Sequence, residues 1–141
     1  MGNVEGGEWK EPTAVQMQSI PILAQGRDLL AASHTGSGKT GAFLVPSLAL
    51  LSKKKKKKKK RRRVRVLILS PTRELCQQTF QETQRLAQGS GLKAGLLLSH
   101  VNEEDQDLAF DIVVSTPLAL SSLPPTSSFL SKYLSFLYLL F

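Results

Sequence analysis

Gly36 and Gly38 stand two residues apart and are followed at once by Lys39 and Thr40. Glycine adopts backbone angles that a Cβ forbids, and it carries no side chain to block an approaching group. A helix is predicted to begin near Lys39, so its unpaired N–H groups and the positive end of its dipole face the same turn. Converging N–H groups together with a lysine indicate a binding site for phosphates.

The segment from Ser33 to Thr40 fits this pattern, and we call it the phosphate loop; its members are Ser33, His34, Thr35, Gly36, Ser37, Gly38, Lys39 and Thr40. Lys39 is expected to reach the β- and γ-phosphates of ATP, and the Thr40 hydroxyl to ligate Mg²⁺, which makes these two the candidate catalytic residues. The pattern asks for Gly or Ala where Ser33 stands, so Ser33 is a small departure. His34 occupies a variable position and is given no catalytic role. A mere turn is disfavoured, because a strand, a loop and a helix are predicted in the required order.

Helical and strand patterns alternate along the chain. Helices are predicted over 13–26, broken into two short pieces at Pro21, over 39–51, bent or ended near Pro46, and over 73–88, with Gly89 past the end. Short apolar runs predict strands over 28–32, 64–69, 96–98 and 112–114. Such alternation predicts an α/β domain with a mostly parallel sheet.

One run of sequence, residues 53–63, consists of eleven lysines and arginines and supplies more positive charge than the formal net charge of +8. Like charges repel and cannot pack, so this run is predicted to be a disordered, solvated insertion. Its composition also favours targeting to the nucleus or nucleolus and non-specific attraction of RNA. The rest of the chain is mildly acidic, so the basic pI is weak support for a nucleic-acid-binding face.

Cys76 is the single cysteine, so no internal disulfide can form, and a reducing, intracellular setting is favoured. It lies on the apolar side of its predicted helix and is expected to be buried. Residues 121–141 form an apolar tail whose structure the sequence does not define. A membrane span needs about 20 apolar residues, and residues 129–141 are too few and too polar, so no membrane partner is expected.

Over residues 9–120 the chain resembles the DEAD-box ATP-dependent RNA helicases. Trp9 to Gln16 resembles the adenine-recognising Q motif, in which the Gln16 amide would present a donor and an acceptor to the adenine edge. The phosphate loop matches motif I, Ser70 to Leu75 matches motif Ia, and Ser115-Thr116-Pro117 resembles the start of motif Ib. Residues 64–75 and 111–120 are similar to the Rok1-like branch, which is linked to ribosome assembly.

The resemblance implies a P-loop NTPase domain with a RecA-like parallel sheet flanked by helices. It implies ATP and Mg²⁺ as cofactors and the RNA backbone as partner, without sequence preference. The residues implied in nucleic-acid binding are Pro71, Thr72, Arg73, Glu74 and Thr116. A partial helicase ATP-binding domain is therefore expected over residues 1–120, with the basic insertion at 53–63.

Three elements of the family pattern are not found. Leu118-Ala119 stands where Gly-Arg is expected after Thr116-Pro117, the Gly-Gly element between motifs Ia and Ib is missing, and no Asp-Glu-Ala-Asp sequence occurs. We therefore expect a domain truncated before motif II, with no second RecA-like domain. Phosphoryl transfer needs a metal-binding carboxylate, a group that orients the water and a positive charge on the transferred phosphate. Three alternatives stay open: an RNA-stimulated ATPase seen in part, a module that binds nucleotide and RNA without turnover, and a non-functional truncated product.

Overall fold

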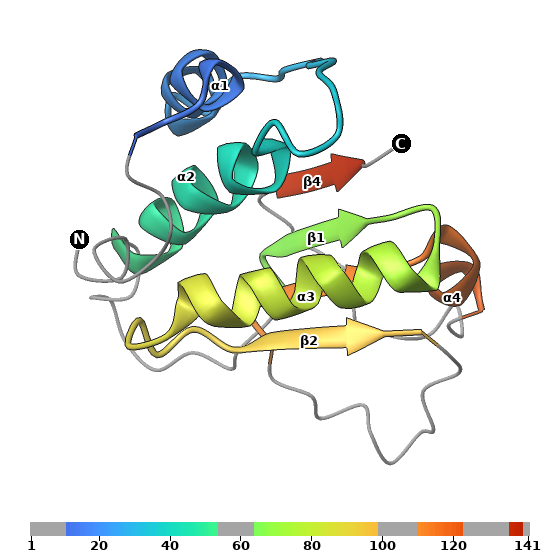
Figure 1. The fold of residues 1–141 in the computed structure, drawn as a ribbon. Helices are drawn as coiled ribbons and strands as arrows, with labels where there is room; N and C mark the ends of the chain where they lie inside the picture. Colours follow the sequence, from blue (N-terminus) through green and yellow to red (C-terminus); the bar gives the residue numbers. More distant parts are fainter. Residues whose placement is uncertain (1–10, 54–63, 99–109, 123–135, 140–141) are drawn as a thin grey trace.

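The computed structural model describes residues 11–53, 64–98, 110–122 and 136–139 (Figure 1). The helices are α1 (Ala14–Ala24), α2 (Lys39–Lys53), α3 (Arg73–Ala87) and α4 (Pro117–Ser121). The strands are β1 (Val66–Leu69), β2 (Ala94–Leu97), β3 (Ile112–Ser115) and β4 (Phe136–Leu139). Apart from Lys53, the predicted disordered insertion lies outside the described residues.

The four strands form one parallel sheet in the order β2-β3-β1-β4. On one side of β1, Val66 lies opposite Ile112 and Leu69 opposite Ser115. On the other side, β4 pairs with β1 over its whole length. Because every pairing is parallel, the carboxyl ends of the strands meet at a single edge of the sheet, which is where ligands bind in open α/β folds. The predicted α/β class with a parallel sheet is confirmed.

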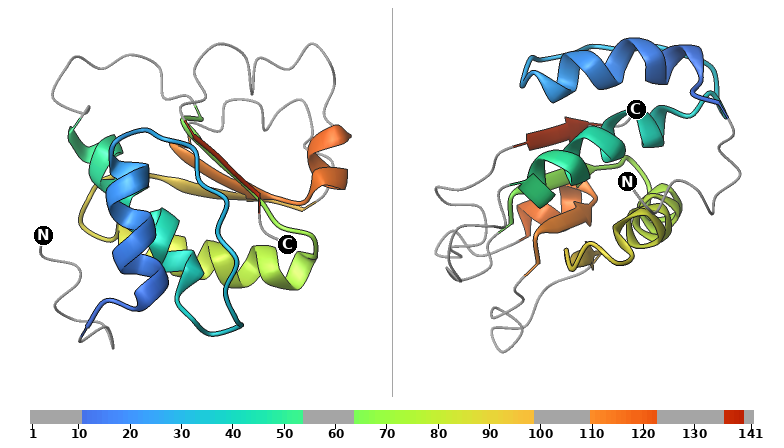
Figure 2. Two further views of the ribbon diagram at one scale, coloured as in Figure 1. Left: turned by 90° about the horizontal axis from the view of Figure 1, so that it is seen from above. Right: turned by 90° about the vertical axis from the view of Figure 1, so that its left-hand side faces the viewer.

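Two apolar clusters lie on the two faces of this sheet. Val66 and Ile68 of β1, with their neighbours on β3, pack against α2 and α3. Leu67 and Val113 point to the opposite face and pack with Ala119 of α4. Burial on both faces explains the almost continuous apolar sequence of β1 and β3. α2 lies between α1 and α3 in Figure 1 and in the right-hand view of Figure 2, so α1 is attached to the sheet through α2.

The two helices with an internal proline, α1 and α2, are continuous, and the prediction that Pro21 splits its segment was wrong. α2 likewise runs through Pro46 to Lys53. A proline removes one backbone hydrogen bond and crowds the preceding turn. In α2 the apolar side chains before and after Pro46, such as Leu44 and Leu48, are held in the same core. Tertiary packing therefore outweighs the local penalty.

The strand predicted over 28–32 was also wrong. Residues 27–34 form neither helix nor strand, and the side chains of Leu29 and Leu30 are 38% and 97% exposed. A strand requires a partner, and residues 27–34 pair with none of the four strands of the sheet. The apolar run at residues 28–32 was therefore not sufficient to form a strand of the sheet.

Part of the tail joins the domain, because β4 belongs to the sheet. Residues 123–135 and 140–141 lie outside the described part of the chain. Among the residues that the structure describes, no helix has the length and apolar character needed to cross a membrane.

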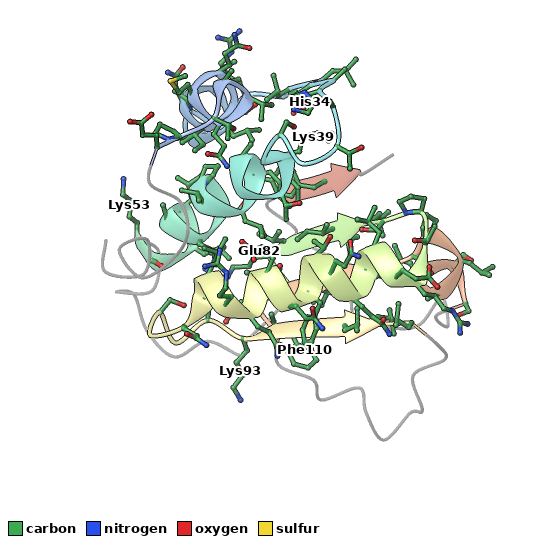
Figure 3. The ribbon with its side chains drawn as sticks, in the orientation of Figure 1. His34, Lys39, Lys53, Glu82, Lys93 and Phe110 are labelled. Atoms are coloured by element: carbon green, nitrogen blue, oxygen red, sulfur yellow. The ribbon has the colours of Figure 1, made fainter. Side chains whose placement is uncertain are left out.

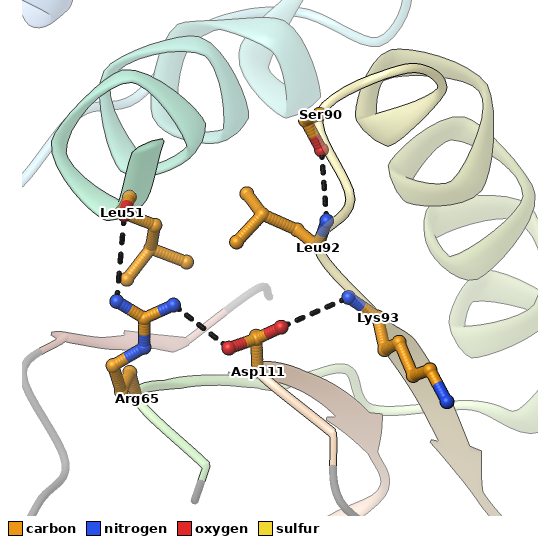
Figure 4. Close-up of polar contacts among 6 residues, drawn as sticks. All are labelled: Leu51, Arg65, Ser90, Leu92, Lys93 and Asp111. Carbon is orange, nitrogen blue, oxygen red and sulfur yellow. Dashed lines mark hydrogen bonds and ion pairs between the residues drawn. The ribbon is translucent and has the colours of Figure 1, made fainter. Parts of the chain in front are cut away.

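A buried carboxylate joins the beginnings of three strands (Figure 4). Asp111 is 4% exposed. Its Oδ1 accepts a hydrogen bond from the Arg65 guanidinium at 2.7 Å, and its Oδ2 accepts one from the Lys93 backbone N–H at 3.0 Å. Arg65 also donates to the Leu51 carbonyl at 3.4 Å, which connects the end of α2 to the group. This network fixes the start of the sheet far from its carboxyl edge.

We predict that Asp111→Ala lowers the free energy of unfolding by about 3 kcal/mol, because removing one partner of a buried ion pair leaves the other uncompensated. Urea denaturation measures the change. The matched control is Glu82→Ala, which removes the more exposed pair between Glu82 and Arg85 and should cost less than about 1 kcal/mol. Equal losses for the two variants would contradict the role assigned to Asp111.

Candidate nucleotide-binding site

The phosphate loop is the turn that leads into α2, and Figure 1 shows it on the side to which the strand arrows point. Gly36 and Gly38 have φ angles of 79° and 87°, a region that L side chains rarely adopt. α2 begins at Lys39, directly after the second glycine. The predicted loop and helix therefore exist, and the loop directs a helix N-terminus toward the carboxyl edge of the sheet.

The Lys39 side chain, labelled with His34 in Figure 3, bonds to carbonyl oxygens of its own loop. Its ammonium donates to the Ser33 carbonyl at 2.5 Å and to the His34 carbonyl at 2.9 Å. The Ser37 N–H donates to the same His34 carbonyl at 3.4 Å. The Lys39 ammonium, which the sequence predicts to bind the phosphates, is thus held within the loop by two carbonyl oxygens. Phosphate oxygens are stronger acceptors than carbonyls for an ammonium, because the bond is then between opposite charges.

Gln16 connects α1 to the phosphate loop. Its side chain is 5% exposed; Nε2 donates to the Gly38 carbonyl at 3.1 Å, and Oε1 accepts from the Thr13 N–H at 3.1 Å. Thr13 in turn caps α1, completing a reciprocal capping box. The spacing of Thr13 and Gln16 is the sequence signature of such a box, and the sequence analysis missed it. An amide still has a second N–H and a second lone pair available for adenine.

Gly38 is required by this contact as well as by its backbone angle. A Cβ built on Gly38 would lie 2.5 Å from Gln16 Nε2 and 3.1 Å from Thr13 Oγ1. By contrast, a Cβ on Gly36 would meet nothing within 4 Å. The two glycines therefore serve different purposes: Gly36 supplies only a turn, whereas Gly38 also allows α1 to approach the loop.

The segments that resemble motifs Ia and Ib follow neighbouring strands, β1 and β3. The Ser70 N–H donates to the Ser115 carbonyl at 2.9 Å, so the two segments leave the sheet side by side. Thr72 caps α3 through the Leu75 N–H at 3.2 Å, and Thr116 caps α4 through the Ala119 N–H at 3.2 Å. The structure thus brings together the two groups of residues that the sequence separates.

These predicted nucleic-acid-binding residues differ in exposure. Pro71, Thr72, Arg73 and Glu74 are exposed, whereas Thr116 is only 8% exposed and its hydroxyl accepts the capping bond. Arg73 is the single cation among them and is the first residue of α3. At this edge, Arg73 and the α3 N-terminus can attract a phosphate, while Thr116 positions the backbone of its turn.

Residues 13–137 match the DEAD/DEAH box helicase family. The chain belongs to this family. It is 42% identical over 125 residues to the ATP-dependent RNA helicase ROK1 of Scheffersomyces stipitis, covering 85% of this chain and 22% of that protein. It is 41% identical over 113 residues to the ATP-dependent RNA helicase DDX54 of Mus musculus, covering 77% of this chain and 12% of that protein.

The fold agrees with this membership. A crystal structure of a hypothetical ATP-dependent RNA helicase from Sulfolobus tokodaii superimposes with a TM-score of 0.69 at 28% identity, covering 84% of this chain and 33% of that chain. The RecA-like domain expected from the resemblance to the DEAD-box helicases is confirmed. The chain spans about a fifth or less of the length of the two curated relatives.

Thr40, the predicted Mg²⁺ ligand, lies in the first turn of α2 beside Lys39. Within the described ranges, no group of three or more His, Cys, Asp or Glu side chains is arranged to hold a metal ion. Mg²⁺ usually keeps several waters and binds through nucleotide phosphates with one or two protein groups. One hydroxyl is compatible with that mode.

Tyr138 of β4 contacts the helix that follows the phosphate loop, a contact that the sequence analysis missed. Its ring stacks on Phe43 with centroids 4.8 Å apart, and its hydroxyl lies 2.6 Å from Ser47 Oγ. Because Ser47 donates to the Phe43 carbonyl, the tyrosine is the donor to Ser47. Burial raises the pKa of Tyr138, which keeps that donor protonated. No pattern in the tail of the sequence indicated this contact.

Cys76 is fully buried in α3, as predicted. Burial also raises the pKa of its thiol, so the thiolate is disfavoured and the side chain serves packing rather than chemistry.

We predict that Gly38→Ala destabilises the protein more than Gly36→Ala. Both substitutions place alanine at a positive φ, which costs roughly 1–2 kcal/mol, but only the first also displaces Gln16. Urea denaturation should show an additional loss of about 1 kcal/mol for Gly38→Ala, the scale of a lost hydrogen bond. In a Gln16→Ala background that difference should shrink. An unchanged difference would show that Gln16 does not determine the need for Gly38.

Proposed function

We propose that this chain is the ATP-binding portion of a DEAD-box RNA helicase. The observation that carries the proposal is the position of Lys39, whose ammonium lies among the carbonyls of a two-glycine loop at the start of α2. Helix N-termini with such loops are anion sites. Family membership supplies the identity of the anion, because the relatives are ATP-dependent RNA helicases.

ATP binding follows from the residues of the loop. Lys39 would exchange its two carbonyl acceptors for phosphate oxygens, and backbone N–H groups of the loop and of the first turn of α2 would donate to the same phosphates. Thr40 would hold Mg²⁺, which supplies positive charge to the β- and γ-phosphates when bound. Gln16 would read the adenine edge with the N–H and lone pair that its contacts to Gly38 and Thr13 leave available.

RNA binding follows from the edge where motifs Ia and Ib meet. The backbone of a single strand would contact Arg73, the exposed residues around it and the N-terminus of α3, without reading the bases. The basic run 53–63 would add sequence-independent attraction. We further propose a nuclear or nucleolar location and ribosome-assembly partners, based on that basic run and on the resemblance to the Rok1-like branch.

Hydrolysis and unwinding belong to this proposal only for a form with the full catalytic set. A second candidate function is a module that binds nucleotide and RNA without turnover. It is favoured by the chain's lack of an Asp-Glu-Ala-Asp sequence. Both functions require the same phosphate site.

The proposed function predicts that Lys39→Ala reduces the affinity for Mg·ATP at least tenfold, because it removes the only side-chain charge in the loop. Isothermal titration calorimetry measures the affinity. Lys53→Ala is the matched control, since Lys53 ends the same helix and is exposed. Equal affinities of Lys39→Ala and the unsubstituted chain would refute the phosphate site.

The RNA interface predicts that Arg73→Ala lowers the salt dependence of single-stranded RNA binding. Loss of one phosphate contact should change the slope of log affinity against log salt by about 0.7, as measured by fluorescence anisotropy. Arg85→Ala provides the control, because Arg85 lies in the last turn of the same helix. If Arg85→Ala changes the slope as much as Arg73→Ala does, the RNA path does not follow the start of α3.

A further inference from the structure

Ser33 is the loop residue that departs from the phosphate-loop pattern, and its hydroxyl has a partner. Ser33 Oγ lies 2.7 Å from Ser37 Oγ, on the far side of the turn. Both side chains are half-buried. Glycine or alanine at position 33 has no hydroxyl and could not form this bond, so the departure gives the loop a contact that the usual residues would not.

The same two residues belong to the hydrogen bonds that hold the loop to itself. The Ser33 carbonyl accepts from Lys39, and the His34 carbonyl accepts from both Lys39 and the Ser37 N–H. Two donors that a phosphate would need, the Lys39 ammonium and the Ser37 N–H, therefore point at the backbone of residues 33 and 34. The hydroxyl bond holds Ser37 against this backbone.

We propose that Ser33 is a positioning residue that lowers the affinity of the loop for polyphosphates by bonding to Ser37. The carbonyls of residues 33 and 34 compete with phosphate oxygens for the Lys39 ammonium and the Ser37 N–H. The Ser33–Ser37 bond stabilises the conformation of the loop in which these donors bond to the carbonyls. A ligand shifts such an equilibrium only by its preference for one arrangement. Removing the Ser33–Ser37 bond therefore lowers the free energy needed to open the loop for a polyphosphate.

This inference rests on the proposed function, since it concerns the same phosphate site. A neutral hydrogen bond contributes a factor of about five to an equilibrium. Ser33→Ala should therefore tighten binding about fivefold. A purely structural role for Ser33 predicts the opposite sign, because a loosened loop would hold its N–H groups less well.

The test is calorimetric titration of the full 141-residue chain with Mg·ATP and, separately, with inorganic tripolyphosphate. Ser33→Ala and Ser37→Ala should each tighten binding of both ligands about fivefold. The double variant should gain no more than either single variant, because both break the same bond. Ser33→Thr keeps the hydroxyl and should stay near the original affinity. Weaker or unchanged binding in Ser33→Ala, additive effects, or an effect on Mg·ATP alone would overturn the proposal.

Ser121→Ala is the matched control, because it removes a serine hydroxyl that bonds to the carbonyl three residues earlier in α4, and it should leave both affinities unchanged. The same titrations distinguish failure of the proposed function from failure of the role given to Ser33. If the unsubstituted chain binds neither ligand, the proposed function and the present inference both fail. If it binds both in a manner that depends on Lys39, yet Ser33→Ala does not bind more tightly, only the role of Ser33 is refuted.

Discussion

Parallel pairing on both sides of β1 is the constraint on which the rest of the structure depends. It places the ends of β1 and β3 next to each other, so the segments that resemble motifs Ia and Ib leave the sheet together. It also brings β4 beneath α2, where Tyr138 contacts Phe43 and Ser47. The phosphate loop begins that helix, so the position of the nucleotide site depends on a strand from the other end of the chain.

Much of this arrangement could be predicted from local sequence. The helix from Arg73 ends close to the predicted residue, because Gly89 follows it with a φ of 72°. The strands at 66–69 and 112–115 agree with their apolar runs, because burial on both faces leaves no polar alternation. The phosphate loop was predictable since its glycines, lysine and threonine must be adjacent in sequence to act together.

The errors and omissions concern interactions between residues far apart in sequence. Leu29 and Leu30 have the composition of a strand, yet their segment pairs with none of the strands of the sheet. The bond from Gln16 to Gly38 and the ion pair of Arg65 with Asp111 depend on how helices and strands pack. The bond between Ser33 and Ser37 is local, but it depends on backbone angles at Gly36 that spacing alone does not specify.

The central claim is that the phosphates of ATP bind at the loop between α1 and α2. Amide chemical shifts of the labelled chain, followed by NMR during titration with Mg·ATP, test it most directly. The account predicts the largest shifts at the backbone amides of Gly36, Ser37, Gly38, Lys39 and Thr40, together with the side-chain amide of Gln16. Saturable shifts confined to other residues, with these amides unchanged, would contradict it.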